Sequence, residues 1–219
     1  MSITLIVSVV LASSGVCMGL TMLAYAKMPG RRIREEKGRL LKGPRVMARM
    51  ALTMVSSVIL VFALTHLLEA RLFYDRPTAW WRGALEGVGI LAVYDLLYYL
   101  MHRYPFHRWP WLRRVHAVHH RARHPIAIDS LFLHPVENFL GLSLLIFCTW
   151  LVGPVNIYAF GVVFLIYSWL NIIVHCGVDL PIPYFRMLAR KHDHHHTDMR
   201  SGNYASITPL PDLIFGTAE

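Results

Sequence analysis

The chain has 219 residues, of which 55% are hydrophobic and 16% are charged, and its mean hydropathy is +0.43. Ordinary soluble domains carry about 25% charged residues, so this composition disfavours a soluble domain and indicates a membrane protein of one-domain size. The net charge of +9 is compatible with binding to a nucleic acid. However, the basic residues lie between apolar runs, without any zinc-finger or RNA-binding motif, so we expect no nucleic acid partner.

Five apolar runs follow one another along the chain and predict four to five membrane crossings. About 20 apolar residues are needed to span ~30 Å of hydrocarbon. No Lys or Arg precedes the first run and a basic cluster follows it, so we expect a retained span and not a cleaved signal peptide. The fourth run is short and ends at Gly153-Pro154, so the last two runs form either crossings or a re-entrant hairpin. The runs cover residues 2–26, 47–68, 83–101, 139–152 and 157–174.

Lys and Arg are distributed unevenly between the two sides of this topology. Of the 22 basic residues, 19 lie in 27–49, in 102–135 and in the tail after residue 175, and only Arg71, Arg76 and Arg82 lie opposite. The positive-inside rule therefore predicts that the basic side is cytoplasmic, in a multi-pass protein of a bacterial inner membrane or the endoplasmic reticulum. Twelve of the 13 histidines fall on this side, so histidines far apart in sequence can converge there.

Most of these histidines belong to three clusters. In the second and third clusters, spacings of i, i+3 and i+4 predict three imidazoles on one face of a helix. His102 and His107 are ~140° apart on a straight helix, and we expect Pro105 to kink the chain so that His107 returns toward His102. His175, at the end of the fifth run, is a ninth candidate ligand. The clusters are His102-Arg-Tyr-Pro-Phe-His107, His116-Ala-Val-His119-His120 and His192-Asp-His-His195-His196.

Nine imidazoles exceed the needs of one metal ion. Imidazole binds zinc, copper, iron and nickel, and a single zinc ion takes only three or four protein ligands. Nine candidates therefore suit two ions with four or five nitrogens each. The three cysteines form no C-x-x-C pair, so neither thiolate ligation nor a disulfide framework is expected.

Polar residues near the clusters are candidates for orienting the ligands. Asp95, Tyr99 and His102 are spaced i, i+4 and i+7, and we expect the Asp95 carboxylate to accept a hydrogen bond from a ligating imidazole. Asn171 lies one turn before the ninth histidine and is expected to face the same cavity, as a weak or water-mediated ligand. A further orienting pair is predicted at His134 and Glu137.

In this order, the clusters resemble the signature boxes of the fatty acid hydroxylase and sterol desaturase superfamily of integral membrane di-iron enzymes. The boxes are H-x3–4-H, H-x2-H-H and again H-x2-H-H, and the likeness extends to Asp212-Leu-Ile-Phe-Gly216-Thr217. The resemblance implies an all-α fold, with membrane helices below a cytosolic helical cap that carries the histidines. It also implies two iron ions and an external electron donor. We therefore expect membrane spans in 1–82 and a catalytic domain in 83–219. In some members a further histidine stands where this chain has Asn171.

The predicted function is hydroxylation or desaturation of a lipid with dioxygen as co-substrate. The lipid enters sideways from the membrane, and the basic face suits an acidic donor resembling cytochrome b5 or ferredoxin. Two readings from other classes stay open: a membrane b-type cytochrome with axial histidine pairs, and a zinc-dependent membrane hydrolase or metal transporter. The sequence does not identify the lipid, and it does not distinguish hydroxylation from desaturation.

Overall fold

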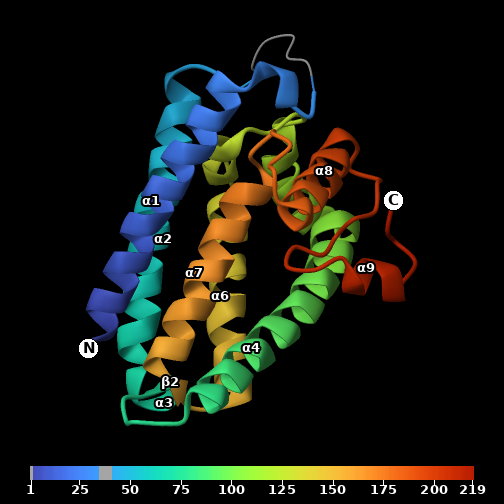
Figure 1. The fold of residues 1–219 in the computed structure, drawn as a ribbon. Coiled ribbons are helices and arrows are strands. Elements are labelled where there is room, and N and C mark those ends of the chain that lie inside the picture. The colour runs from blue at the N-terminus through green and yellow to red at the C-terminus, as the bar shows by residue number, and fades with distance from the viewer. Residues whose placement is uncertain (1, 35–40) are drawn as a thin grey trace.

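The computed structural model describes residues 2–34 and 41–219; Lys37 and Arg39 of the basic loop lie outside the described residues. Five of the described helices are long and apolar enough to cross a membrane, which confirms the predicted all-α, multi-pass architecture. The helices alternate in direction, and α4 crosses the others obliquely (Figure 1). They are α1 (Ile3–Lys27), α2 (Pro44–Leu67), α4 (Trp80–Met101), α6 (Pro135–Val152) and α7 (Ile157–Val174).

Short elements close the two ends of this bundle. At one end β1 and β2 pair in parallel, with Phe73 opposite Val155. At the other end the helical turns that carry the histidines pack together (Figure 1). The short elements are η1 (Pro29–Arg31), α3 (Glu69–Leu72), β1 (Phe73–Tyr74), η2 (His102–Phe106), α5 (Pro110–His116), η3 (His119–Arg121), η4 (Ala127–Leu131), β2 (Val155–Asn156), α8 (Pro183–Thr197) and α9 (Leu210–Ile214).

The fourth and fifth runs form two separate full helices. Helix α6 begins at Pro135, earlier than the apolar run at residue 139, because proline is well accommodated in the first turn of a helix. It ends at Gly153, whose φ of 103° is a left-handed conformation that glycine adopts readily. Helix α7 is capped by Asn156, whose Oδ1 accepts a hydrogen bond from the Tyr158 amide at 2.9 Å.

The first two helices pack directly on the later ones. A Cβ built on Gly161 of α7 would lie 2.7 Å from Cγ2 of Ile6, so glycine is required for this close approach of α1. Ile6 and Val61 belong to the same buried apolar cluster as Ile90 and Phe160. The predicted parts 1–82 and 83–219 thus share one core, and the division at residue 82 stays a prediction.

The histidine cap, defined as residues 102–134 and 175–219, also contacts the loop after α1. The Ile33 amide donates to the Gly177 carbonyl at 3.0 Å. Arg34 Nε lies 2.6 Å from Oδ2 of Asp193, and the Asp193 side chain is buried. The described parts of the three basic stretches therefore gather at the cap end of the bundle, as the predicted topology requires.

Candidate metal centre

The nine predicted ligands meet inside the histidine cap and form two groups. All candidate ligand atoms of one group lie within 4.8 Å of one another. The five-histidine group contains His102, His107, His116, His120 and His195, and the four-histidine group contains His119, His175, His192 and His196. Convergence of sequence-distant histidines, which the topology predicted, is thus present in the fold.

Each of the two H-x2-H-H clusters divides between the groups. Helix α5 ends at His116, and the next turn is a tighter 3-10 turn that starts at His119. His116 and His120 face one group while His119 faces the other. The prediction of one continuous helix is wrong for this cluster, because α5 ends at His116. The third cluster does lie on one helix, α8 (Pro183–Thr197), and it divides in the same way, with His195 apart from His192 and His196.

The first cluster closes through a widened turn. Residues 102–106 form a π-helical turn that contains Pro105, and the Trp109 amide donates to the Tyr104 carbonyl, five residues back. A π-turn brings residues five apart onto one side. The ring centroids of His102 and His107 lie 4.9 Å apart, so His107 returns toward His102 as predicted.

Neighbouring Nε2 atoms are separated by distances that match adjacent corners of a metal coordination shell. Two nitrogens at ~2.1 Å from one ion and at right angles to each other are ~3.0 Å apart. In the five-histidine group, Nε2 of His116 lies 3.0 Å from Nε2 of His102 and 3.0 Å from Nε2 of His120. In the four-histidine group, Nε2 of His175 lies 3.0 Å from Nε2 of His119 and 2.9 Å from Nε2 of His192.

In several of these histidines, the partner of Nδ1 explains why Nε2 carries a free lone pair. Nδ1 of His102 is 2.7 Å from the Tyr204 carbonyl and Nδ1 of His195 is 2.7 Å from the Gly202 carbonyl, and a carbonyl can only accept. Nδ1 is therefore the protonated nitrogen, and Nε2 is not. The two Nε2 lone pairs then face each other at 3.1 Å, an arrangement that a cation between them would stabilise.

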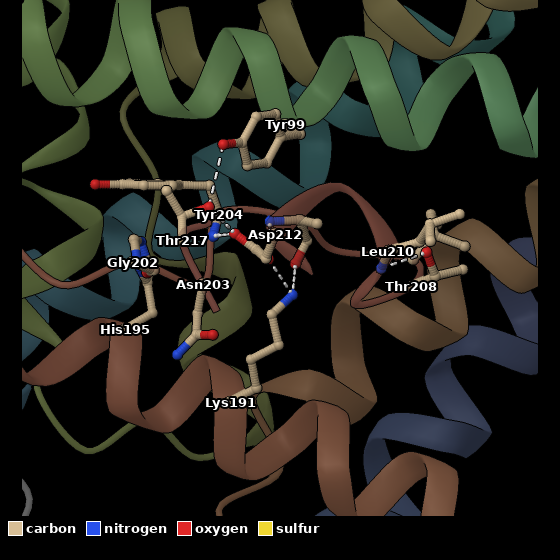
Figure 2. A network of polar contacts seen from close by, with 12 residues as sticks. Tyr99, Lys191, His195, Gly202, Asn203, Tyr204, Thr208, Leu210, Asp212 and Thr217 are labelled. Atoms are coloured by element: carbon tan, nitrogen blue, oxygen red, sulfur yellow. Dashed lines mark hydrogen bonds and ion pairs between the residues drawn. The ribbon is translucent and has the colours of Figure 1, made fainter. Parts of the chain in front are cut away.

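An irregular C-terminal segment supplies much of this orientation in the five-histidine group. The Met199 carbonyl accepts from Nδ1 of His107 at 2.8 Å, close in sequence to the carbonyls that hold His102 and His195. Figure 2 shows how this segment is fixed: the Asp212 carboxylate accepts from the amides of Tyr204 and Ala205.

Asp212 is itself completely buried and paired. Nζ of Lys191, on α8, lies 2.6 Å from Oδ2 of Asp212, and the Thr217 hydroxyl donates to Oδ1 at 2.9 Å (Figure 2). The Lys191 ammonium also donates to the Ala205 carbonyl at 2.7 Å. A buried pair of this kind is costly to break, because one charge would stay buried alone. The terminal motif therefore positions ligands without being one of them.

The side chains of Asp95 and Tyr99 contact the C-terminal segment and not the histidine ligands. The Asp95 carboxylate accepts from the amides of Ile207 and Thr208 at 3.0 and 3.1 Å and from the Thr208 hydroxyl at 2.6 Å, so the predicted hydrogen bond from an imidazole is not made. The Tyr99 hydroxyl lies 3.1 Å from Oγ1 of Thr217. Both side chains hold the C-terminal segment against α4. Spacing along α4 predicted their shared face but not which segment packs on it.

Glu137 is the carboxylate that does orient an imidazole. Its Oε1 accepts from Nδ1 of His116 at 2.7 Å. His134, the other member of the predicted pair, caps α6 by accepting from the Val136 amide. The Asn171 carbonyl accepts from Nδ1 of His175 at 2.6 Å, and Asn171 lines the cavity described below. Its role as a weak or water-mediated ligand stays a prediction.

Burial keeps these imidazoles neutral, as metal binding requires. It lowers the pKa of His107 and of His175 to about 4, and that of His195 to about 3. Burial also holds the pKa of five further ligands far below the ordinary value, namely His116, His119, His120, His192 and His196. In addition, Nε2 of His107 is buried without a hydrogen-bond partner among the described residues, so its lone pair is available to a metal ion.

A cavity of about 400 Å³ connects the two groups with the membrane helices. His102 and His116 of the five-histidine group line it, and so do three histidines of the four-histidine group. The rest of its wall is mainly apolar and comes from α1, α2, α4, α6 and α7. A volume of this size suits a small organic ligand. Sequence patterns did not predict this cavity, because its wall is assembled from five separate helices.

Comparisons with known proteins point to one family. The family model described as fatty acid hydroxylase matches residues 87–217. Methylsterol monooxygenase 1 of Rattus norvegicus is 30% identical over 163 residues, which is 66% of this chain and 50% of the relative. Methylsterol monooxygenase 2-2 of Arabidopsis thaliana is 31% identical over 155 residues, 64% of this chain and 54% of the relative.

A relative of lower identity is an aldehyde decarbonylase. Very-long-chain aldehyde decarbonylase GL1-6 of Oryza sativa subsp. indica is 27% identical over 181 residues, 74% of this chain and 28% of the relative. The chain thus spans about half the length of the sterol relatives and less of the rice protein. No solved structure gives a significant match.

Proposed function

This chain belongs to the fatty acid hydroxylase family, a family of iron-dependent oxygenases, and from this membership we propose that it is a membrane-bound di-iron enzyme that hydroxylates or desaturates a lipid. The observation that supports the proposal most strongly is the pair of histidine groups with lone pairs turned inward at the inner end of an apolar cavity. Oxidation of a lipid carbon needs these two features together.

The donor set fits two iron ions with histidine as the sole side-chain ligand. The five-histidine group would hold one ion and the four-histidine group the other, with Asn171 beside the second. Iron held there would supply oxidising chemistry toward a saturated carbon, with dioxygen, two electrons and two protons drawn from outside the chain. The protein contributes imidazoles whose tautomers are fixed at several positions by hydrogen bonds from Nδ1, and a mainly apolar cavity next to the histidines where a lipid would lie.

The proposed substrate is a lipid, because the cavity begins between membrane helices. Gly15 on α1 and Met54 on α2 both line the cavity and are exposed, so its wall opens between these two helices toward the bilayer. The sterol activity of two relatives makes a sterol one member of this class. Fatty acyl chains and other membrane lipids remain members of the class as well.

An external donor is proposed to deliver the electrons to the cap. The cap carries ten of the 22 basic residues of the chain and the stretch 27–49 carries nine more, and the positive-inside rule favours placement of both on the cytoplasmic side. A basic face attracts an acidic protein such as a cytochrome b5 or a ferredoxin by electrostatic steering. Reduction by such a donor should slow as ionic strength rises, because salt screens exposed charges. A rate independent of salt would contradict this docking.

The geometry argues against the two readings from other classes. Nε2 atoms at about 3 Å from one another suit neighbouring positions on a single ion, whereas axial ligands of haem lie on opposite faces of a porphyrin ring. A zinc hydrolase needs only three or four ligands, and five imidazoles in one group exceed that number.

One experiment tests the function directly. The protein is expressed in iron-rich medium, its metals are counted, and lipid extracts of cells with and without it are compared by mass. We expect about two irons per chain and a lipid that gains one oxygen or loses two hydrogens, only when dioxygen and reductant are present. Stoichiometric zinc, or lipid conversion that continues under argon, would contradict the proposal.

A further inference from the structure

Two hydroxyl groups in the cavity wall are buried without any hydrogen-bond partner among the described residues. They are Oγ1 of Thr53 on α2 and Oγ of Ser130 on η4. The residues are 2% and 1% exposed, and both line the cavity that reaches the histidines. A buried hydroxyl loses its hydrogen bonds to water, so native proteins rarely leave it unpaired.

The other buried threonines of the membrane helices are satisfied within their own helix. Thr65, which lies on the same helix as Thr53, donates to the Val61 carbonyl at 2.7 Å. Thr149 donates to the Leu145 carbonyl at 2.9 Å. Such bonds to the carbonyl one turn earlier are usual for threonine in helices. Thr53 lacks this bond, and its position in the cavity wall indicates a partner that enters the cavity, whereas the unpaired hydroxyl of Ser143 on α6 lies outside that wall.

A fixed polar pair stands beside these hydroxyls. Oγ of Ser57, one turn along α2 from Thr53, lies 2.9 Å from Oδ1 of Asn138, and both residues line the cavity. Nδ2 of Asn138 donates to the Ser56 hydroxyl at 3.1 Å. The side chains of Thr53, Ser57, Ser130 and Asn138 are called the polar wall below. It is assembled from α2, η4 and α6.

The polar wall lies at the histidine end of the cavity. Asn138 follows Glu137, which accepts from Nδ1 of His116 in the five-histidine group. The opposite parts of the cavity are apolar and include Leu11, Val61 and Phe164. The cavity is therefore amphipathic, with its polar portion next to the candidate metal ligands.

We propose that the polar wall binds the hydroxyl group of a lipid alcohol, so that the substrate is an amphipathic lipid held with its hydroxyl at the histidine end. This inference rests on the proposed function and names the substrate class of that same cavity. A hydroxyl suits the wall because it both donates and accepts, as do the unpaired groups of Thr53 and Ser130. Among the described residues that line the cavity there is no Lys or Arg, which disfavours a carboxylate or phosphate head group.

The test compares each alcohol with the hydrocarbon that lacks only the hydroxyl. Purified iron-loaded protein in detergent is incubated under argon with an equimolar pair, either cholestanol and cholestane or hexadecanol and hexadecane. Lipid that stays with the protein is extracted and counted by mass, relative to the ratio in protein-free micelles. We expect the wild-type protein to retain the alcohol about tenfold over the hydrocarbon in at least one pair, as one or two buried hydrogen bonds would produce. The pair with the larger ratio identifies a sterol or a linear chain.

Two variants remove the unpaired groups, and two matched variants serve as controls. Thr53→Val and Ser130→Ala should each lower the preference about threefold, and the double variant should abolish it. Thr65→Val removes a buried hydroxyl of the same helix that is already paired and lies outside the cavity wall. Ser143→Ala removes an unpaired hydroxyl that also lies outside the wall. Both controls should keep the wild-type ratio. Ser130→Ala keeps the test decisive if Thr53→Val fails to fold.

The possible results separate this inference from the proposed function. A wild-type ratio near one in both pairs, or no retention of any probe, would overturn the inference and indicate that the polar wall holds water only. A preference that is unchanged in the double variant would overturn it too. Binding is measured without turnover, so a protein that oxidises lipid but ignores the hydroxyl loses only this inference. A protein that prefers alcohols yet never consumes dioxygen loses only the proposed function.

Discussion

The five-histidine and four-histidine groups are fastened to the fold in different ways. In the five-histidine group, three imidazoles are oriented by carbonyls of residues 199–204, which belong to no helix or strand, and a fourth by Glu137. In the four-histidine group, His175 is oriented by the Asn171 carbonyl within its own helix, and His196 by the Ala122 carbonyl. The five-histidine group thus depends on residues 199–204, which are distant in sequence from most of its histidines. The four-histidine group depends on carbonyls at the ends of helices.

The two histidine groups should therefore be sensitive to different substitutions. Packing of α7 and α8 alone sets much of the four-histidine group. The five-histidine group needs, in addition, the buried Lys191–Asp212 pair, which holds the irregular segment in place. A change in the C-terminal segment after α8 should therefore affect the five-histidine group selectively.

Loss of one ligand from either group should abolish activity. His195→Ala removes a nitrogen from the five-histidine group and His119→Ala one from the four-histidine group, and each should lose lipid oxidation and most of one iron while membrane insertion persists. His194→Ala is the matched control, because His194 belongs to neither group and its Nδ1 lies 3.6 Å from Glu219. Full turnover in His195→Ala or His119→Ala would remove that residue from the metal ligands.

Release of the tail should weaken one group only. Asp212→Asn breaks the pair with Lys191 and loosens the segment that orients His102 and His195. Partners that orient metal ligands are worth ~10–100-fold in metal affinity or activity, so we expect a loss of that size with iron retained in the four-histidine group. Asp179→Asn, which alters the exposed pair with Arg190, should change neither. Equal loss of both irons on Asp212→Asn would refute the asymmetry.

Acid should destabilise the metal-free protein. The pKa of His107 and of His175 is lowered to about 4 from the ordinary 6.5, so an unfolded chain binds protons that the folded chain rejects. Stability is therefore complete above about pH 6.5 and falls as the pH drops toward 4, by about 1.4 kcal/mol per pH unit for each such histidine. Thermal unfolding in detergent between pH 7.5 and 5 measures it. A constant melting temperature over this range would contradict the buried, neutral state of either group.

Narrowing the cavity should weaken substrate binding without affecting one histidine group more than the other, since histidines of both groups line the cavity. A Cβ at Gly15 meets no atom within 4 Å, so Gly15→Phe is expected to fold and to fill space in the cavity, raising KM about tenfold. Gly19→Phe is the control: it is one turn further along α1, equally unobstructed, and outside the cavity wall. Identical KM values for the two variants would show that the lipid takes another route.

Sequence patterns predicted the helices and the ligands better than the groups they form. The fifth apolar run, 157–174, coincides with α7, and all nine candidate histidines lie in the two groups. Helical periodicity kept the three histidines of each H-x2-H-H cluster together, whereas in both clusters the i+3 histidine, His119 or His195, belongs to a different group from its two neighbours. Spacing along one segment does not show how imidazoles from separate elements combine. Asp95 was assigned to an imidazole because spacing reveals a shared face and not the segment that covers it.

The orienting groups were the least predictable part. Most are backbone carbonyls, such as those of Met199 and Gly202, and every residue type carries a carbonyl. Only the terminal Asp212–Thr217 motif indicated that the segment after α8 contributes to the site. The polar wall escaped prediction for a similar reason, since isolated residues such as Thr53 and Ser130 show no pattern until the helices pack.

We propose that each histidine group holds its own iron ion. Anomalous diffraction from crystals of iron-loaded protein, recorded on both sides of the iron absorption edge, locates iron without reference to activity. The account predicts two iron peaks per chain, one enclosed by the Nε2 atoms of the five-histidine group and one by those of the four-histidine group. A single peak shared by all nine imidazoles, or peaks that do not change across the iron edge, would contradict it.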